Sequence, residues 1–261
     1  MDPTLSIAVR AAREAGKLIA RSSDRLSQDM IFEKSANNYS TSVDQAAEAA
    51  IIKVISQAYP DHSFLAEEGG LLQNANPDAL WIIDPLDGTT NFIHGLPNYV
   101  VSIAFQFKGV LEYGVIYHPL TQDLFTAGRG KGAQLNDTRI RVSQHTKFEG
   151  ALISAGLPRP ANYLKTYLEF NQKLQGRVAG IRRSGASALD LAYVAAGKLD
   201  LFWCIDSKIW DIAAGAVLIK EAGGVIGYPD ATDTLENGHI VAGNSKIVKS
   251  AVELLRPCLP R

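Results

Sequence analysis

Residues 81–92, which read WIIDPLDGTTNF, set the organisation that we expect for the whole chain. The segment begins as an apolar run and ends in turn-forming residues, so it predicts a strand that runs into a tight turn. Pro85 disfavours a helical conformation at Asp84, which argues against a helix with Asp84 and Asp87 on one face. We therefore expect Asp84 at the end of a strand and Asp87 in the turn that follows.

This turn has the composition of a site for a metal ion and a phosphate group. The carboxylates of Asp84 and Asp87 and the carbonyl of Leu86 are hard oxygen donors of the kind that Mg²⁺ prefers. Gly88 lets a ligand approach the backbone, and a short helix beginning near Thr89 would present free N–H groups to phosphate. An isolated Asp-Gly pair is more often an ordinary turn, but the length of this pattern favours a site.

The flanking segments predict a sheet covered by helices. Apolar residues at steps of three and four predict helices from residue 5 to about 26 and from 43 to 58. Ser42 and Gln45 have the spacing of a capping box, which places Asp44 in the first turn of the second helix. Short apolar runs predict strands at residues 63–66, 80–84, 99–107, 111–117 and 124–127. Because these strands are joined too tightly for helical crossovers, we expect a largely antiparallel sheet.

The chain after Gly150 has a different pattern. Strand-like segments at 151–157 and 178–183 alternate with helix-like segments at 163–174, 188–196, 211–222 and 245–255. This predicts a second sheet with helices on its faces. We expect a single domain over residues 1–261 with a subdomain boundary near residue 150, and a ligand site in the cleft between the subdomains.

Composition limits the classes of partner. The chain has 26 Lys and Arg residues against 27 Asp and Glu, so its net charge of −1 gives little general attraction to nucleic acid or to an anionic membrane. Cys204 and Cys258 have no spacing typical of a disulfide framework or a zinc site. Charged residues interrupt the apolar N-terminal segment, which argues against a signal peptide or a membrane span. We expect a cytoplasmic protein without a membrane partner or a direct nucleic-acid motif.

Three motifs resemble those of the inositol monophosphatase family, whose members are Mg²⁺-dependent, lithium-sensitive phosphatases. DPLDGTTNF resembles the family signature, LAEEGG at residues 65–70 its upstream acidic motif, and WDIAAGAVLIKEAGG at residues 210–224 its downstream motif. RRSGASALDLAYVAAGKLD at residues 182–200 is similar to the bacterial suppressor-type members. The resemblance implies an α+β fold, a layered αβαβα sandwich of two packed subdomains with the active site between them, and a homodimer.

The resemblance also implies roles for single residues. Two or three Mg²⁺ ions would be held by Glu67, Asp84, the Leu86 carbonyl, Asp87 and Asp211. The catalytic residues, which hold or orient the attacking water, would be Glu67, Thr89 and Asp44. The substrate would be bound by Gly88, Thr89, Asp87, Gly185 and Asp211. Lys34 is expected near the site, and Glu68 is expected in solvent or behind the metal ligands.

The leading function hypothesis is hydrolysis of myo-inositol 1-phosphate, or a related small phosphorylated alcohol, by direct attack of metal-activated water. Cys204 stands where many relatives have a glutamate that accepts hydrogen bonds from inositol, and Ala186 stands where some have threonine. A thiol is a poor acceptor, so the sequence favours phosphate hydrolysis more than inositol specificity, and Asp206 would replace the glutamate only if the loop were rearranged. Fructose 1,6-bisphosphate, histidinol phosphate and 3′-phosphoadenosine 5′-phosphate are related substrate hypotheses.

An interaction protein is the alternative from another functional class. The suppressor-type members include one that takes part in transcription antitermination, so the resemblance also implies a transcription-factor partner for a chain that retains the phosphatase fold. No basic stripe or nucleic-acid motif favours direct RNA recognition.

Overall fold

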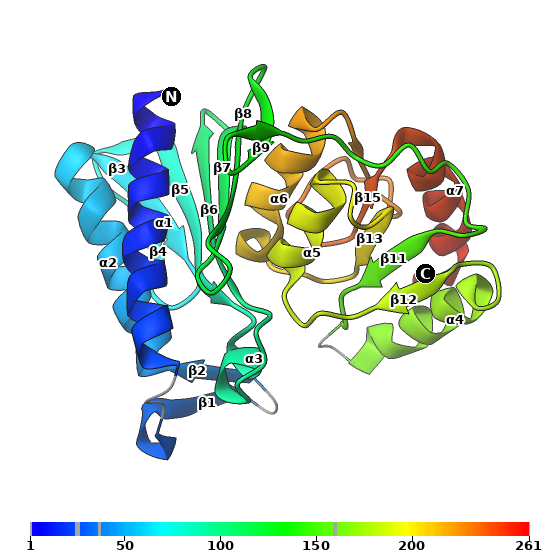
Figure 1. The fold of residues 1–261 in the computed structure, drawn as a ribbon, viewed down its shortest axis with the longest axis horizontal. Coiled ribbons are helices and arrows are strands. Elements are labelled where there is room, and N and C mark those ends of the chain that lie inside the picture. Colours follow the sequence, from blue (N-terminus) through cyan, green and yellow to red (C-terminus); the bar gives the residue numbers. More distant parts are fainter. Residues whose placement is uncertain (1, 24–26, 36–37, 159–160, 261) are drawn as a thin grey trace.

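The computed structural model describes residues 2–23, 27–35, 38–158 and 161–260. Helices and sheets alternate in five layers across the molecule (Figure 1). The helices are α1 (Pro3–Ser22), α2 (Ser42–Ala58), α3 (Thr89–Ile93), α4 (Leu164–Leu174), α5 (Ser187–Ala195), α6 (Ile209–Glu221) and α7 (Ser245–Leu255). Short 3-10 helices lie at Gln28–Met30, Ala161–Tyr163 and Arg256–Cys258. The expected α+β sandwich is confirmed.

The larger sheet has eight strands in the order β10-β9-β8-β7-β6-β5-β3-β4. Its strands are β3 (His62–Ala66), β4 (Gly70–Leu72), β5 (Asn76–Asp87), β6 (Val100–Phe107), β7 (Val110–His118), β8 (Asp123–Gly128), β9 (Gly132–Leu135) and β10 (Thr138–Arg139). All neighbouring pairs are antiparallel except β3 and β5, which are parallel. The five predicted strands are therefore present, and the sheet is largely antiparallel as expected.

Helices α1 and α2 cover one face of this sheet (Figure 1). Small residues of α1, such as Ala11, Ala12 and Ala15, are fully buried, so the helix lies close to the strands. The N-cap of α2 is Thr41, which forms a capping box with Asp44, so the predicted box of Ser42 and Gln45 is wrong by one residue. The predicted end of the first helix, at residue 26, lies outside the described residues, and α1 ends at Ser22.

The second sheet has five strands in the order β12-β11-β13-β15-β14. Its strands are β11 (Leu152–Ala155), β12 (Gly180–Arg182), β13 (Leu201–Cys204), β14 (Val225–Gly227) and β15 (Ile240–Gly243). Helices α5 and α6 lie between the two sheets, while α4 and α7 cover the outer face of the second (Figure 1). A separate hairpin of β1 (Ile31–Ser35) and β2 (Asn38–Thr41) precedes α2.

Helix α6 packs tightly because small residues line it. A Cβ atom on Gly215 would lie 2.5 Å from the Leu191 side chain of α5, and one on Gly114 of β7 would lie 2.5 Å from the Ala214 carbonyl oxygen. These close approaches bring the beginning of α6 against the larger sheet, where Ser102 Oγ of β6 donates to the Trp210 carbonyl oxygen at 3.2 Å. No helix among the described residues has the length and apolar character needed to cross a membrane.

Candidate metal and phosphate site

Strand β5 bulges where its acidic residues lie. It continues through Asp87 and does not end at Asp84 as predicted. Asp84 pairs with Ser102 and Asp87 with Val100, so β5 has one more residue than β6 over this interval. Within the bulge, Leu86 N–H donates to Asp84 Oδ1 at 3.0 Å. The bulge thus brings two carboxylates and a backbone carbonyl into one short segment.

The carboxylates of this segment are buried among other carboxylates. Asp84 is 2% exposed and Asp87 is 9% exposed. Burial raises the pKa of Asp84 well above its ordinary value, and the charges of Glu67, Asp87 and Asp211 raise it further. Burial likewise raises the pKa of Asp87, with Asp211 as the next cause. Buried carboxylates that repel one another destabilise a fold unless a cation or a proton joins them.

This donor set fits a hard cation by its chemistry. Within the described ranges, no three His, Cys, Asp or Glu side chains are grouped closely enough to form a ready metal site. Several carboxylates are nevertheless close enough to raise one another's pKa, and carboxylate oxygens are the ligands that Mg²⁺ favours. They comprise Glu67, Asp84, Asp87 and Asp211, with the Leu86 carbonyl on the same bulge. A cation here would remove the mutual repulsion of these groups.

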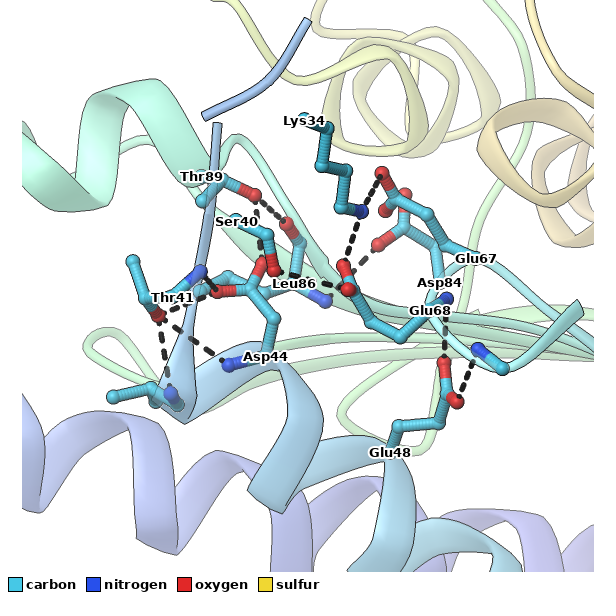
Figure 2. Close-up of polar contacts among 12 residues, drawn as sticks. Lys34, Ser40, Thr41, Asp44, Glu48, Glu67, Glu68, Asp84, Leu86 and Thr89 are labelled. Carbon is cyan, nitrogen blue, oxygen red and sulfur yellow. Dashed lines mark hydrogen bonds and ion pairs between the residues drawn. The ribbon is translucent and has the colours of Figure 1, made fainter. Parts of the chain in front are cut away.

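Glu67 follows β3 directly, and its N–H donates to the Ile83 carbonyl oxygen at 3.1 Å. Lys34 Nζ lies 3.3 Å from Glu67 Oε1 and 2.5 Å from Glu68 Oε1 (Figure 2). Ser40 Oγ also donates to Glu68 at 2.9 Å. The Glu68 side chain is only 8% exposed and contacts both strands of the β1–β2 hairpin. Glu68 is therefore held beside Glu67 and is not in solvent.

Asp44 links the hairpin, α2 and the start of α3. Its Oδ2 accepts hydrogen bonds from Thr41 N at 2.8 Å and from Thr41 Oγ1 at 2.5 Å. Thr89 Oγ1 lies 2.8 Å from Asp44 Oδ1 and 3.0 Å from the Leu86 carbonyl oxygen (Figure 2). Burial raises the pKa of Asp44 from 3.8 to about 6. The structure thus brings together Asp44, Thr89 and Leu86, three of the residues expected at the site.

Gly88 permits the turn between β5 and α3. Its φ is 98°, a left-handed conformation that favours glycine, and a Cβ atom would lie 2.6 Å from the Asn98 carbonyl oxygen. Helix α3 then begins at Thr89, as expected, although it is only five residues long. A larger residue at Gly88 would displace the backbone that the motif assigns to phosphate.

Hydrogen bonds join this turn to the first turn of α5 and to the loop before it. Asp87 Oδ2 accepts the Ala188 N–H at 2.6 Å, and Asn91 Nδ2 donates to the Ser184 carbonyl oxygen at 2.8 Å. Gly185 has a φ of 83°, and a Cβ atom there would lie 2.9 Å from Asn91 Nδ2. Gly185, expected at the substrate, therefore lies beside Asn91 of the signature segment although the two are far apart in the sequence.

The side of the site formed by the second sheet is built differently. Cys204 ends β13, is 1% exposed, and its Sγ lies 3.6 Å from the Gly238 carbonyl oxygen. Burial raises the pKa of the Cys204 thiol to about 12, so it stays neutral. Asp206 has a φ of 60°, and its N–H donates to His239 Nδ1 at 3.0 Å. Asp211 lies in the first turn of α6 and its Oδ2 accepts the Lys208 N–H at 3.2 Å.

Two buried acids near the site were missed by sequence reasoning. Glu48 of α2 accepts the N–H groups of Glu68 and Gly69 at 2.9 and 2.8 Å. Asp190 of α5 accepts a hydrogen bond from Ser154 Oγ at 2.6 Å, and burial raises its pKa from 3.8 to about 6. Both stand at core-facing positions of otherwise apolar helix segments, which is the signal that could have identified them.

The fold and this carboxylate site agree with one family of proteins. The sequence profile of the Inositol monophosphatase family matches residues 1–258, and the chain belongs to this family. Members of the family are generally metal-dependent phosphomonoesterases and typically use Mg²⁺.

Individual relatives match nearly the whole chain. It is 50% identical to Nus factor SuhB of Pseudomonas aeruginosa, over 100% of this chain and 98% of that protein. It is 46% identical to Nus factor SuhB of Escherichia coli K12, over 98% of this chain and 97% of that protein. The structure of the extragenic suppressor protein suhB of Bartonella henselae superposes with a TM-score of 0.94 at 38% identity, covering 98% of this chain and 99% of that one. The inositol monophosphatase of Anabaena gives 0.86 at 36% identity, covering 98% and 96%.

Proposed function

We propose that this chain has a Mg²⁺-dependent phosphomonoesterase site and also acts in transcription antitermination. Different observations support the two roles. The first is supported by the carboxylates buried at the β5 bulge, and the second by the relatives that are called Nus factors. The names of these relatives favour the antitermination role over any particular substrate.

One observation carries the phosphatase role: Asp84 and Asp87 are buried beside further carboxylates that raise the pKa of each. The ligands of the Mg²⁺ ions would be Glu67, Asp84, the Leu86 carbonyl, Asp87 and Asp211. Bound Mg²⁺ supplies positive charge to the phosphate oxygens and lowers the pKa of water. No serine or cysteine nucleophile is required, because water attacks the phosphorus directly and in line.

The chain's own residues would position the reactants. The backbone N–H groups of Gly88 and Thr89 would bind the phosphate, together with the substrate contacts assigned to Asp87, Gly185 and Asp211. Because the Thr89 hydroxyl lies within hydrogen-bond distance of Asp44 Oδ1, its proton is engaged and its lone pairs can accept from the attacking water. Glu67 would hold the same water from the other side. Asp44 and Thr89 thereby fix the direction of attack.

Phosphate release across a substrate panel tests the enzyme role. The panel contains myo-inositol 1-phosphate, which is the leading substrate, and fructose 1,6-bisphosphate, histidinol phosphate and 3′-phosphoadenosine 5′-phosphate. We expect release that requires Mg²⁺, is abolished by EDTA and is inhibited by Li⁺. Release that persists in EDTA would contradict the metal-dependent mechanism, and no release from any substrate would remove the enzyme role.

Capture of purified transcription factors tests the antitermination role. Wild-type protein and the Asp84→Asn variant are immobilised and compared, because that substitution changes the buried site without altering the surface. We expect both proteins to retain the same factor and only the wild type to release phosphate. Absence of specific capture by either protein would exclude the partner.

The proposal also specifies how the protein is organised. We take it to be a cytoplasmic homodimer in which each chain is one domain with a subdomain boundary near residue 150. Sedimentation of the purified protein measures whether it is a homodimer. Limited proteolysis checks the second, since a boundary between packed subdomains predicts slow, correlated loss of both halves and not the release of one stable half.

A further inference from the structure

Helix α2 presents two buried carboxylates on one face, one turn apart. Asp44 is fully buried and contacts Thr41 and Thr89, while Glu48 is 6% exposed and contacts the segment that follows Glu67 (Figure 2). The same helix therefore contacts the water-orienting side and the metal-ligand side of the proposed site. Because a helix is rigid over one turn, it fixes the separation of these two sides.

The contact of Glu48 uses both of its carboxylate oxygens. Oε2 accepts the Glu68 N–H at 2.9 Å, and Oε1 accepts the Gly69 N–H at 2.8 Å. The preceding amide is held as well, since Glu67 N–H donates to the Ile83 carbonyl oxygen at 3.1 Å. Three successive amides after β3 are thus fixed, two of them by Glu48.

We propose that Glu48 is a positioning residue that holds Glu67 at the distance from Asp44 and Thr89 that metal binding and catalysis require. The proposal rests on the function proposed above. Glu48 reaches the site only through the backbone of Glu68 and Gly69, so it is not itself a ligand or a catalytic group. Substitution of such outer-shell groups typically reduces metal affinity or activity by about 10- to 100-fold.

A purely structural role explains the contact less well. Glu48 lies near the charges of Glu67 and Glu68, and Lys34 Nζ contacts those two carboxylates, whereas the partners of Glu48 among the described residues are two backbone amides. A buried carboxylate among like charges is a costly way to stabilise a loop. The Glu48 carboxylate provides two acceptor oxygens in fixed positions, whereas a glutamine of the same size provides only one.

The hydrogen bond between Glu48 and the Gly69 N–H can also be disturbed by a substitution at Gly69. A Cβ atom on Gly69 would lie 2.9 Å from Glu48 Oε1, and the glycine does not have a positive φ, so this contact is the strain that Gly69→Ala introduces. Glu48→Gln keeps the shape of the side chain but replaces one acceptor with a donor, which must then face a backbone N–H. Because both substitutions change one contact, their effects should not add in the double variant.

The experiment compares wild type, Glu48→Gln, Gly69→Ala and the double variant, with Gln45→Ala on the exposed side of α2 as the matched control. Calorimetric titration with Mg²⁺ alone measures metal affinity, and hydrogen exchange of the peptide that covers residues 62–72 measures the segment directly. We expect affinity to fall about 10- to 100-fold and exchange to accelerate in both single variants, but not in the control. In phosphate release at saturating Mg²⁺, kcat should fall while KM stays unchanged.

If Glu48→Gln bound Mg²⁺ with wild-type affinity and differed from wild type only in a lower melting temperature, the proposal would be overturned. Additive effects in the double variant would also overturn it, since they would mean that the two residues act separately. If wild-type protein releases no phosphate, the proposed function fails, and the positioning role is then decided by Mg²⁺ affinity and exchange alone. Because Glu48→Gln keeps the volume of the side chain, it provides a folded variant even if Gly69→Ala unfolds.

Discussion

The two sides of the candidate site differ in how firmly their polar groups are held. On the side of the larger sheet, Asp44, Glu48 and Glu68 each accept at least two hydrogen bonds. On the side of the second sheet, Cys204 is a neutral thiol whose Sγ lies 3.6 Å from the Gly238 carbonyl oxygen, and Asp206 follows at a positive φ of 60°. On the first side, side-chain carboxylates accept hydrogen bonds from several elements, whereas on the second side Asp206 is held through its backbone N–H by His239 Nδ1.

The fold constrains the phosphate and metal side of the site more than the alcohol side. Phosphate and metal chemistry depends on oxygen atoms held within narrow distances, so the groups that provide it need many partners. An alcohol leaving group can be accommodated in more than one way. The chain departs from the expected family pattern at Cys204, on the less constrained side, and keeps the pattern at the β5 bulge.

The largest effect should follow from a change on the network side. Asp87→Asn removes a charge from the buried cluster while keeping the size of the side chain, and we expect Mg²⁺-dependent phosphate release to fall by about 1000-fold. Asp78→Asn, at the exposed beginning of β5, is the matched control and should be fully active. Equal activity in the two variants would remove Asp87 from the site.

Thr89 should matter nearly as much, because its hydroxyl is the link between Asp44 and the Leu86 carbonyl oxygen. Thr89→Val keeps the volume but removes the donor, and we expect kcat to fall by about 100-fold. Thr89→Ser keeps the hydroxyl and should recover most of the rate. Equal rates for Thr89→Val and Thr89→Ser would contradict the proposal that this hydroxyl orients the attacking water.

The buried acid Asp190 should make the metal-free protein less stable as pH rises. Its pKa is raised by burial from 3.8 to about 6, so between about pH 4 and 6 the folded state keeps a proton that the unfolded state releases. Stability from this group is therefore present below pH 4 and lost toward pH 6, by about 2 kcal/mol. Urea unfolding in EDTA should show this decline in wild type and a smaller one in Asp190→Asn. Parallel pH curves for the two proteins would contradict the assignment.

The smallest effect should come from the less constrained side. Cys204→Ala removes a neutral, buried thiol whose Sγ contacts the Gly238 carbonyl oxygen, so we expect unchanged phosphate release and a loss of about 1 kcal/mol in unfolding free energy. Steady-state kinetics and urea unfolding measure both quantities. A marked loss of turnover in a folded Cys204→Ala protein would place this thiol in the site and erase the difference between the two sides.

Hydrophobic periodicity predicted the two-sheet organisation and seven of the strands, because it is a local signal, while the contiguous motifs implied the layered sandwich through their resemblance to a family. It missed the short strands β4, β9 and β10 of the larger sheet and β13, β14 and β15 of the second. It placed the end of β5 too early, since Pro85 in a run of turn residues gives no sign that pairing resumes beyond it. It chose Ser42 over Thr41 as the cap because adjacent hydroxyl residues fit the same pattern. Glu48 was missed because its partners are backbone amides 20 and 21 residues away, which no local pattern contains.

If the buried carboxylates of the β5 bulge form a cation site, the metal should change the stability of the fold. The decisive measurement is the free energy of unfolding of wild type and Asp84→Asn, each in EDTA and in Mg²⁺. Asp84 is repelled by three neighbouring carboxylates, so Asp84→Asn should be the more stable protein in EDTA. Mg²⁺ should then stabilise the wild type and have little effect on the variant. A variant that is less stable than wild type in EDTA, and that gains as much from Mg²⁺, would contradict the claim.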